Sequence, residues 1–522
     1  MSPERSPATS RLLRDKVRGF RVIWLAPLLA FVALASWALA SPMGASPDDD
    51  YHLVSTWCAD PGKTWACEVG TDLTQRVVPE ALVKSPLCFA HHPERSAACQ
   101  KDTFSLDPVP TEMTHRGNFA GQYPPVYYAA MNIVVSPNLE FSVVLMRLIN
   151  AFVFVAITTA LFAALPSIRR PALVWGWLAS TVPLGLFLIA SNNPSSWAIV
   201  GVGTSWIALL GYLESSGRRK VGLGLIFVVS VIMAAGSRGD TAVYAGFAIA
   251  LVLVLRFRNV RRFWMDAILP LVMGVVAGLF VLMSRQSQFG VEGLPSTAVS
   301  DPTVASAAAQ SSDSFGHIAT LLFNVPSLWA GVFGYWGLGW LDTGMPAIVT
   351  FGAITVAVGA VFTGLRVMTW RKAIALGAIA TLLVFIPTWV LYQGGQQVGQ
   401  EVQPRYLLPL IVMFIGLAMV SANGRSPRLT RTQRILVGVT ISVAQLVALY
   451  FNMRRYIHGD TPGTGWNLDQ HTLWWWDIAV SPMTVLLVGS LAFSVTIWIL
   501  LFRTPEIAGI SAKSEETEPV RI

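Results

Sequence analysis

The chain has 522 residues, of which 53% are hydrophobic and 13% charged, and its formal net charge is +8. An average soluble protein is about 25% charged, so this composition argues against a soluble enzyme, a disordered protein and a coiled coil. The positive residues lie in short clusters between apolar runs, a placement that indicates membrane topology rather than nucleic-acid binding.

Apolar runs of about 20 residues recur along the whole chain, and each is expected to form a helix because backbone in lipid must satisfy its own hydrogen bonds. The sequence therefore predicts an all-α, polytopic transmembrane helix bundle of about twelve spans, bounded by the lipid bilayer. The predicted spans are 22–41, 141–165, 172–190, 195–213, 221–236, 241–256, 264–284, 345–365, 373–391, 405–421, 435–451 and 480–502.

The basic residues favour one orientation in the cell (cytoplasmic) membrane. With the N-terminus in the cytoplasm, 25 of the 37 Lys and Arg residues fall in cytoplasmic segments, and each such segment holds at least two. This agrees with the positive-inside rule and places both termini in the cytoplasm. The alternative is a cleaved signal peptide, since the first run ends in Ala38-Leu39-Ala40, which would leave eleven spans.

Four regions follow from these spans. Residues 1–21 are expected to form a basic cytoplasmic N-terminus, and 22–421 a transmembrane core that includes an extracytoplasmic loop at about 42–138. Residues 422–502 would add C-terminal transmembrane helices with a Trp-rich outer loop, and 503–522 a disordered cytoplasmic tail.

All four cysteines of the chain lie in the first outer loop, at Cys58, Cys67, Cys88 and Cys99. An even number confined to one extracytoplasmic loop predicts disulfides. Three pairings are possible, of which the pairing of sequence neighbours is simplest. Metal binding is the alternative, but no CxxC motif is present.

Two other outer segments are rich in aromatic residues. The segment His317–Trp340 is apolar and could lie along the membrane interface instead of spanning, after a Ser- and Ala-rich loop at Pro295–Ser314. The last outer loop contains Trp466 and the run Trp474-Trp475-Trp476. Such Trp residues serve as interfacial anchors or, alternatively, stack on sugar rings.

The acidic segment Ser46–His52 follows the first span directly and contains Asp48, Asp49 and Asp50. Adjacent carboxylates repel one another, which raises their proton affinity unless a cation neutralises them. Such a cluster can supply a general base or bind a divalent metal such as Mg²⁺ or Mn²⁺. The structural alternative is a helix whose first turn carries acidic residues.

Several short motifs resemble a family of uncharacterised bacterial polytopic membrane proteins that is itself similar to the GT-C superfamily of polyprenyl-phosphate-sugar glycosyltransferases. The matching residues are Pro47-Asp48-Asp49 with His52, Tyr123-Pro124-Pro125-Val126-Tyr127-Tyr128, Arg147, Asn193-Pro194, and Gln403-Pro404-Arg405-Tyr406-Leu407-Leu408-Pro409.

The resemblance implies a GT-C-like core in which an acidic motif of the first outer loop acts as base or metal site. Asp49 is then the leading candidate for the catalytic base, followed by Asp48, with His52 beside them; Asp48, Asp49 and Asp50 are the candidate metal ligands. This chain has Asp where the second acidic position is often Glu, so the resemblance does not fix which carboxylate is essential.

Arginines near the outer boundary suit an anionic lipid substrate, because an Arg at membrane depth needs a partner and binds phosphate through a forked donor set. The candidate phosphate- and substrate-binding residues are Arg405, Arg238, Arg285, Arg147, Tyr123 and Tyr406. The alternative is that Arg238 pairs with Asp240 and Arg405 with Glu401, holding loops together.

The leading hypothesis is a membrane glycosyltransferase that moves a sugar from a polyprenyl-phosphate donor to an envelope glycan, lipid or protein. The competing classes are a transporter or flippase of lipid-linked precursors, since about twelve spans also suit a transporter, and a non-catalytic envelope assembly protein. The sequence lacks P-loop, GxSxG and HExxH motifs.

Overall fold

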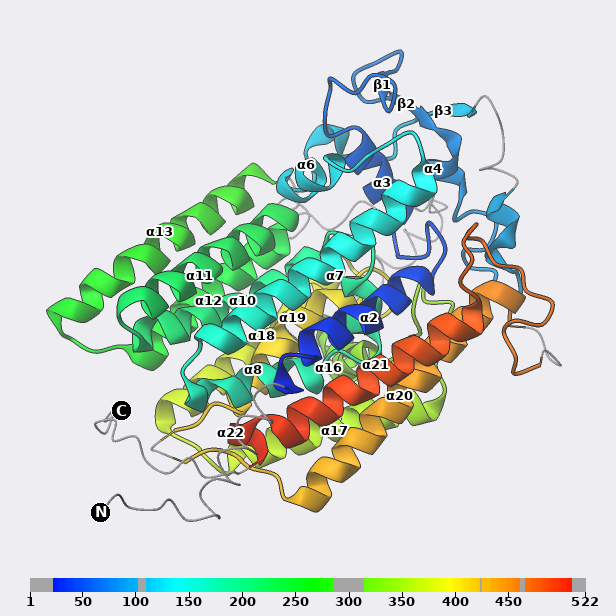
Figure 1. Ribbon diagram of the computed structural model, residues 1–522. Coiled ribbons are helices and arrows are strands. Elements are labelled where there is room, and N and C mark those ends of the chain that lie inside the picture. The colour runs from blue at the N-terminus through cyan, green and yellow to red at the C-terminus, as the bar shows by residue number, and fades with distance from the viewer. Residues whose placement is uncertain (1–21, 102–108, 285–313, 423–424, 461–464, 509–522) are drawn as a thin grey trace, which may run out of the picture.

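The computed structural model describes residues 22–101, 109–284, 314–422, 425–460 and 465–508 (Figure 1). Within these residues, ten helices are long and apolar enough to cross a membrane, which confirms the polytopic helical class. They are α7 (Leu139–Ala164), α10 (Ser195–Glu214), α11 (Gly217–Ser237), α12 (Gly239–Arg256), α13 (Arg261–Met283), α16 (Ser314–Val332), α17 (Ala347–Leu365), α18 (Trp370–Gln393), α20 (Arg431–His458) and α21 (Pro482–Arg503). Two shorter apolar helices accompany them, α2 (Ala26–Leu39) and α19 (Pro404–Ala418).

One end of the bundle carries basic clusters of the described residues, and we call it the basic end (Figure 1, the end near α22). The predicted N-terminal basic segment 1–21 and the tail from residue 509 lie outside the described residues. Arg169 donates to both oxygens of Glu214, at 2.8 and 2.7 Å, and to Ser421 O at 2.6 Å. Lys372 Nζ donates to three backbone carbonyls at the ends of α17 and α19. Arg170 pairs with Glu506 in α22 (Pro505–Ala508) at 3.1 Å. Ion pairs and bonds to backbone carbonyls near helix ends thus hold the elements at the basic end together.

The predicted third span is not one helix. Residues 172–190 form α8 (Arg170–Leu178) and α9 (Leu184–Ile189), separated by a non-helical link. The 3-10 helix η3 (Ser167–Arg169) precedes α8. The prediction of a continuous span was wrong because Pro183 lacks an amide hydrogen and disfavours helix in the residue before it. The link is buried, as non-helical backbone at membrane depth must be.

Helix α16 replaces the interfacial segment that we expected between His317 and Trp340. It is long and apolar enough to cross a membrane, and it packs along α18. Trp329 Nε1 donates to Leu383 O at 3.1 Å, in the middle of α18, whereas His317 lies 3.0 Å from Gln396 O, beyond the end of α18. The expected loop at 295–313 lies outside the described residues.

The first outer loop folds over the other end of the bundle, the loop end (Figure 1, around α3 and the strands). Its three strands form an antiparallel sheet in the order β1-β2-β3, in which Val69 pairs with Arg76 and Val77 with Met113. Both disulfides join sequence neighbours, Cys58 to Cys67 and Cys88 to Cys99, which confirms the simplest pairing. The elements are α3 (Asp49–Trp57), β1 (Glu68–Val69), β2 (Arg76–Pro79), α4 (Glu80–Lys84), η1 (Ala97–Gln100), β3 (Thr111–Thr114), η2 (Asn118–Ala120) and α6 (Val126–Asn132).

Helix α20 fastens this loop to the bundle. A capping box of Thr430 and Gln433 starts α20 at the basic end, and the last turn reaches the loop end. There, Arg455 donates to Phe89 O at 2.7 Å and to Asp342 at 2.9 Å. Because Arg455 is only 3% exposed, these bonds hold the second disulfide loop against the membrane helices.

The Trp run of the last outer loop is buried, so it serves neither as an interfacial anchor nor as a sugar-stacking face. Trp474, Trp475 and Trp476 are 8%, 1% and 4% exposed, and Trp476 Nε1 donates to Leu39 O at 2.8 Å. Trp466 is 76% exposed and stacks on Tyr450 with ring centroids 5.3 Å apart. The run is a packing element that closes the loop end over α2.

Candidate functional site

Residues 38–47, which we call the connector, join α2 to α3 and are mostly buried. Side chains from distant elements donate hydrogen bonds to most of the backbone carbonyls of the connector. Unpaired buried carbonyls would cost stability, and here each bond also fixes the position of the acidic segment that follows. The bonds are from Arg147 to Ala38 O (3.0 Å), Ser41 O (2.6 Å) and Pro42 O (2.7 Å), from Trp476 to Leu39 O (2.8 Å), from Asn452 to Ala40 O (3.0 Å), from Gln100 to Met43 O (2.6 Å), from Trp340 to Gly44 O (2.8 Å), and from Asn193 to Pro47 O (2.7 Å).

Asp48 directly follows the connector and has an unusual backbone conformation. Its φ of 60° and ψ of 21° lie in the left-handed region, and it stands at the N-cap of α3 without capping that helix through its side chain. A non-glycine residue there costs about 1–3 kcal/mol and persists when its surroundings hold it. Here Arg405 and Asn193 hold the preceding carbonyl of Pro47, so the Asp48 carboxylate is free to point away from the helix.

The three adjacent carboxylates point to different partners. Asp48 accepts from Arg405 Nη2 at 2.6 Å and from Arg116 Nη2 at 3.3 Å. Asp50 accepts from the Nε and Nη2 of Arg116. Asp49 turns inward, where it accepts from Ser46 N at 3.3 Å and lies 4.0 Å from Arg147 Nη2. Each carboxylate therefore has an arginine nearby, and these positive charges offset the mutual repulsion of the carboxylates that the sequence implied.

Asp49 is fully buried, and its Oδ1 has no hydrogen-bond partner among the described residues. Burial raises its pKa to about 7, against the opposing effect of Arg147. With Asp50 it occupies the first turn of α3, where a helix favours negative charge. Asp49 and Asp50 thus occupy the first turn of a helix, as the structural alternative for the acidic segment predicted.

Asp48 has the opposite electrostatic environment and is the most exposed carboxylate of the three, with 37% of its side chain accessible. Burial by itself would raise its pKa, but the Arg405 guanidinium, aided by Arg116, lowers that pKa to about 2. Asp48 is therefore an ionised, accessible carboxylate at neutral pH.

His52 lies one turn along α3, inside a group of tyrosines. Its Nδ1 is 2.9 Å from the hydroxyl of Tyr128, and its ring meets those of Tyr51 and Tyr123 edge-on. Burial, with the nearby arginines, holds its pKa well below the usual value, so the imidazole is neutral. Its Nε2 is buried without a hydrogen-bond partner among the described residues, and its catalytic role stays a prediction.

Arg405 and Arg238 approach the same tyrosine from α19 and from the link between α11 and α12. The two guanidinium carbons lie 5.1 and 4.5 Å from the centroid of the Tyr406 ring, and Arg238 also lies 5.6 Å from that of Tyr123. Both arginines are 4% exposed. Within the described chain, Arg405 Nε and Arg238 Nη1 are buried donors without a hydrogen-bond partner.

Of the two alternative ion pairs that the sequence suggested for these arginines, one forms and the other does not. Arg238 does form the expected pair with Asp240, at 2.9 and 3.0 Å. Arg405 does not pair with Glu401, because Glu401 accepts from Gln396 and Arg405 instead binds Asp48. The contact between Arg405 and Asp48 therefore agrees with the expectation that arginines and acidic residues lie at the same end of the bundle.

Two other candidate arginines have different places. Arg147 is 1% exposed and uses both terminal nitrogens on connector carbonyls, so it is a structural residue of the connector. Arg285 lies outside the described residues.

The acidic cluster does not form a metal site of three ligands. Among the described residues, no group of three or more His, Cys, Asp or Glu side chains could hold a metal ion. Asp48 and Asp50 are instead bridged by Arg116, whose charge takes the place that a cation would have. The described side chains at Asp48, Asp49 and Asp50 thus offer no three-ligand site for Mg²⁺ or Mn²⁺, and the expectation of a divalent metal there stays a prediction.

Sequence reasoning missed Arg116, which contacts two of the three carboxylates. It lies after β3 in the same outer loop, and no periodic pattern distinguishes it from other loop arginines. Its one signal is the excess of negative charge at Asp48–Asp50, which a buried or half-buried cluster must neutralise.

The helical bundle and the described spans define a multi-pass membrane protein. The chain belongs to the family described as "Predicted membrane protein (DUF2142)", which matches residues 31–414. The match includes the acidic segment, Arg116, Arg238 and Arg405. No curated protein matches the chain.

Proposed function

We propose that this chain is a membrane glycosyltransferase that moves a sugar from a polyprenyl-phosphate donor to a cell-envelope acceptor. The observation that carries the proposal is the contact of an accessible carboxylate, Asp48, with a buried arginine, Arg405, whose Nε remains free to bind a phosphate oxygen. A base and an anion site must touch the same substrate for group transfer, and here they are adjacent.

The proposed orientation places the loop end outside the cytoplasm. The basic end gathers the Lys and Arg clusters that the positive-inside rule assigns to the cytoplasm, and the two disulfides at the loop end suit an oxidising compartment. Both termini would then be cytoplasmic, and the site would face the outer leaflet.

In the proposed reaction, an acceptor hydroxyl attacks the anomeric carbon of the donor sugar. The bond between that carbon and the phosphate oxygen breaks, its electron pair leaves with the phosphate, and the hydroxyl proton passes to Asp48. The configuration at carbon is inverted. Arg405 and Arg238 stabilise the charge that develops on the phosphate, a role in which fixed donors are effective.

The contact with Arg405 also explains how Asp48, whose pKa is low in the protein alone, could accept a proton during the reaction. In the protein alone, Arg405 holds the Asp48 carboxylate in its ionised form. A donor phosphate would share the Arg405 guanidinium, which weakens its hold on Asp48 and raises the proton affinity of that carboxylate. Asp48 therefore takes the first place as base in this proposal, and the buried Asp49 becomes a positioning residue.

The test is a transfer assay with purified protein in lipid vesicles, against a panel of radiolabelled polyprenyl-phosphate sugars. Asp48→Asn is the informative variant because Asn tolerates the left-handed backbone region, so the substitution removes the base without straining the chain. We expect sugar transfer by the folded protein to fall about 10²- to 10⁴-fold. The unfolding temperature should also fall, because the buried Arg405 loses its charged partner, so the rates are compared for equal amounts of folded protein.

The matched control is Asp72→Asn, which alters an exposed carboxylate in the same outer loop and should transfer sugar at the wild-type rate. Equal rates in wild type and Asp48→Asn would refute the catalytic role of Asp48. Absence of transfer from every donor in the panel by folded wild-type protein would refute the glycosyltransferase assignment itself.

One observation favours the competing transporter class. The break between α8 and α9 gives a discontinuous helix pair within the bundle, and transporters commonly build substrate sites from such helices. Uptake or flipping of a lipid-linked sugar that persists in Asp48→Asn would support this class.

A further inference from the structure

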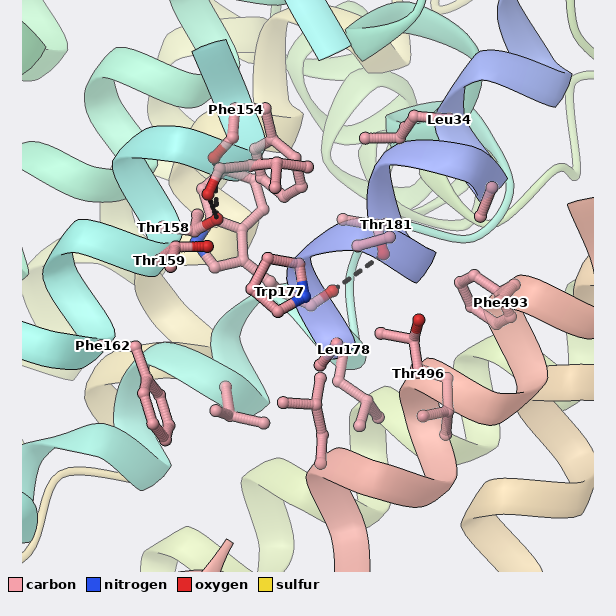
Figure 2. Close-up of a pocket in the computed structure, with 18 of the residues that line it drawn as sticks. Leu34, Phe154, Thr158, Thr159, Phe162, Trp177, Leu178, Thr181, Phe493 and Thr496 are labelled. Carbon is pink, nitrogen blue, oxygen red and sulfur yellow. Dashed lines mark hydrogen bonds between the residues drawn. The ribbon is translucent and has the colours of Figure 1, made fainter. Parts of the chain in front are cut away.

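An apolar cavity of about 170 Å³ lies between α2, α7, α8, α9 and α21, away from the acidic segment (Figure 2). Its lining includes Ile23 and Trp24 just before α2 and continues along α2 to Leu34. On α21 it extends from Phe493 to Leu500, the half of that helix that leads to Arg503 and the basic end. It is therefore separate from the proposed donor site at the loop end.

The cavity is lined mainly by apolar groups. The hydroxyls of Thr158, Thr181 and Thr496 line it, but each donates to the carbonyl four residues back, at 2.7 to 2.9 Å. The Nε1 of Trp177, another lining residue, has no hydrogen-bond partner in the described chain. Most of the other lining side chains are aliphatic or aromatic, and apolar cavities take apolar guests.

The break in the third predicted span helps to create this space. Helix α8 ends at Leu178 and α9 begins at Leu184, so the link between them carries Thr181 into the cavity wall in place of a continuous helix. Figure 2 shows Thr181 and Trp177 facing the same space as Phe493 and Thr496.

The cavity also reaches the lipid-facing surface. Trp24 lines it and is 43% exposed, and its neighbours Leu25 and Leu28 are 51% and 61% exposed. In a bundle that spans a membrane, such side chains at membrane depth contact hydrocarbon. A lipid chain can therefore enter from the side without crossing a polar layer.

We propose that this cavity binds a segment of an acyl chain from a bilayer phospholipid in the leaflet at the basic end. The volume is below the about 300–1,000 Å³ of ordinary small-molecule sites, so it accommodates part of a chain and no head group. A chain that is already in hydrocarbon gains no hydrophobic energy by entering. It gains the van der Waals contacts that an empty void forfeits, and the high concentration of chains in a bilayer makes weak binding sufficient.

The experiment uses the full-length protein in phospholipid vesicles that contain phosphatidylglycerol with a photoreactive diazirine half-way along one acyl chain. After irradiation, mass spectrometry of peptides locates the adducts. We expect adducts at Thr181 and Trp177, which are 6% and 7% exposed and which a chain reaches only from within the cavity.

Ala30→Phe places a ring in the cavity, and the adducts at Thr181 and Trp177 should then fall to background. The matched control is Ala160→Phe, an exposed position on α7 that does not line the cavity, and it should leave the adducts unchanged. This test does not depend on transferase activity, so its outcome is distinguishable from that of the proposed function.

Adducts confined to exposed surfaces such as that of α13 would overturn the proposal. So would adducts at Thr181 that persist in Ala30→Phe, or their absence from wild type, as expected if residues 1–21 fill the cavity instead. If Ala30→Phe does not fold, the wild-type adduct map decides alone.

Discussion

Arg405 on α19 donates to Asp48 at 2.6 Å, although 357 residues separate them in the sequence. The same arginine donates to Pro47 O at 3.1 Å and to the Tyr406 hydroxyl at 3.1 Å. A single guanidinium thus fixes the backbone before Asp48, the Asp48 carboxylate and the neighbouring tyrosine, while its Nε stays available.

Arg405→Lys should separate charge from geometry. Lysine keeps the positive charge but offers a single ammonium group in place of a planar fork, so at most part of this arrangement survives. We expect kcat/KM for the lipid donor to fall roughly 100-fold, equivalent to about 3 kcal/mol, measured in the vesicle assay. Arg366→Lys, at an exposed position of the basic end, is the control, and an equal loss in both variants would contradict a specific role for Arg405.

Asp49 should make stability depend on pH. Its pKa rises from 3.8 to about 7 on folding because of burial. The stability it contributes is therefore fully present below about pH 4 and is lost as the pH rises through about 7. An asparagine side chain does not titrate, so Asp49→Asn should gain stability relative to wild type between about pH 5 and pH 8. Unfolding temperatures of both proteins across that range provide the measurement, and a constant difference between them would show that Asp49 does not titrate there.

Trp476→Phe should weaken the loop end. The substitution keeps an aromatic ring beside Arg147, whose guanidinium carbon lies 5.8 Å from the Trp476 ring centroid, but it leaves Leu39 O without a donor. A buried carbonyl left unpaired in this way costs about 1–3 kcal/mol, and the unfolding temperature should fall. Trp466→Phe, which alters an exposed ring, should leave it unchanged. The opposite pattern would mean that the outer ring matters and the buried bond does not.

The sequence was sufficient for most of the helical bundle because a span is a local property: about 20 apolar residues must lie together. The break at Val182-Pro183 escaped this reasoning, since an average over 172–190 remains apolar despite the proline. The position of α16 inside the bundle was not predicted either. It depends on packing against α18 through Trp329, and no local sequence pattern indicates that contact.

The sequence was sufficient to predict which site residues lie at the same end of the bundle, but not which of them are in contact. The acidic segment follows the first span and Arg405 begins a later one, so a consistent topology brings both to one end. The partner of each side chain was not predictable, because the pairing of Arg405 with Asp48 and not with Glu401 depends on three-dimensional distances. Arg116 and the burial of Asp49 likewise follow from how α3 packs.

The connector described above implies an order of biogenesis. Its residues leave the ribosome well before Asn452 and Trp476, which bind Ala40 and Leu39 and lie 412 and 437 residues further along the chain. Until α20 and the loop after it are in place, the acidic segment lacks two of the bonds that position it. A chain that ends before Asn452 would thus leave the acidic segment without these bonds, and the proposed activity would depend on the insertion of α20 as well as of α2.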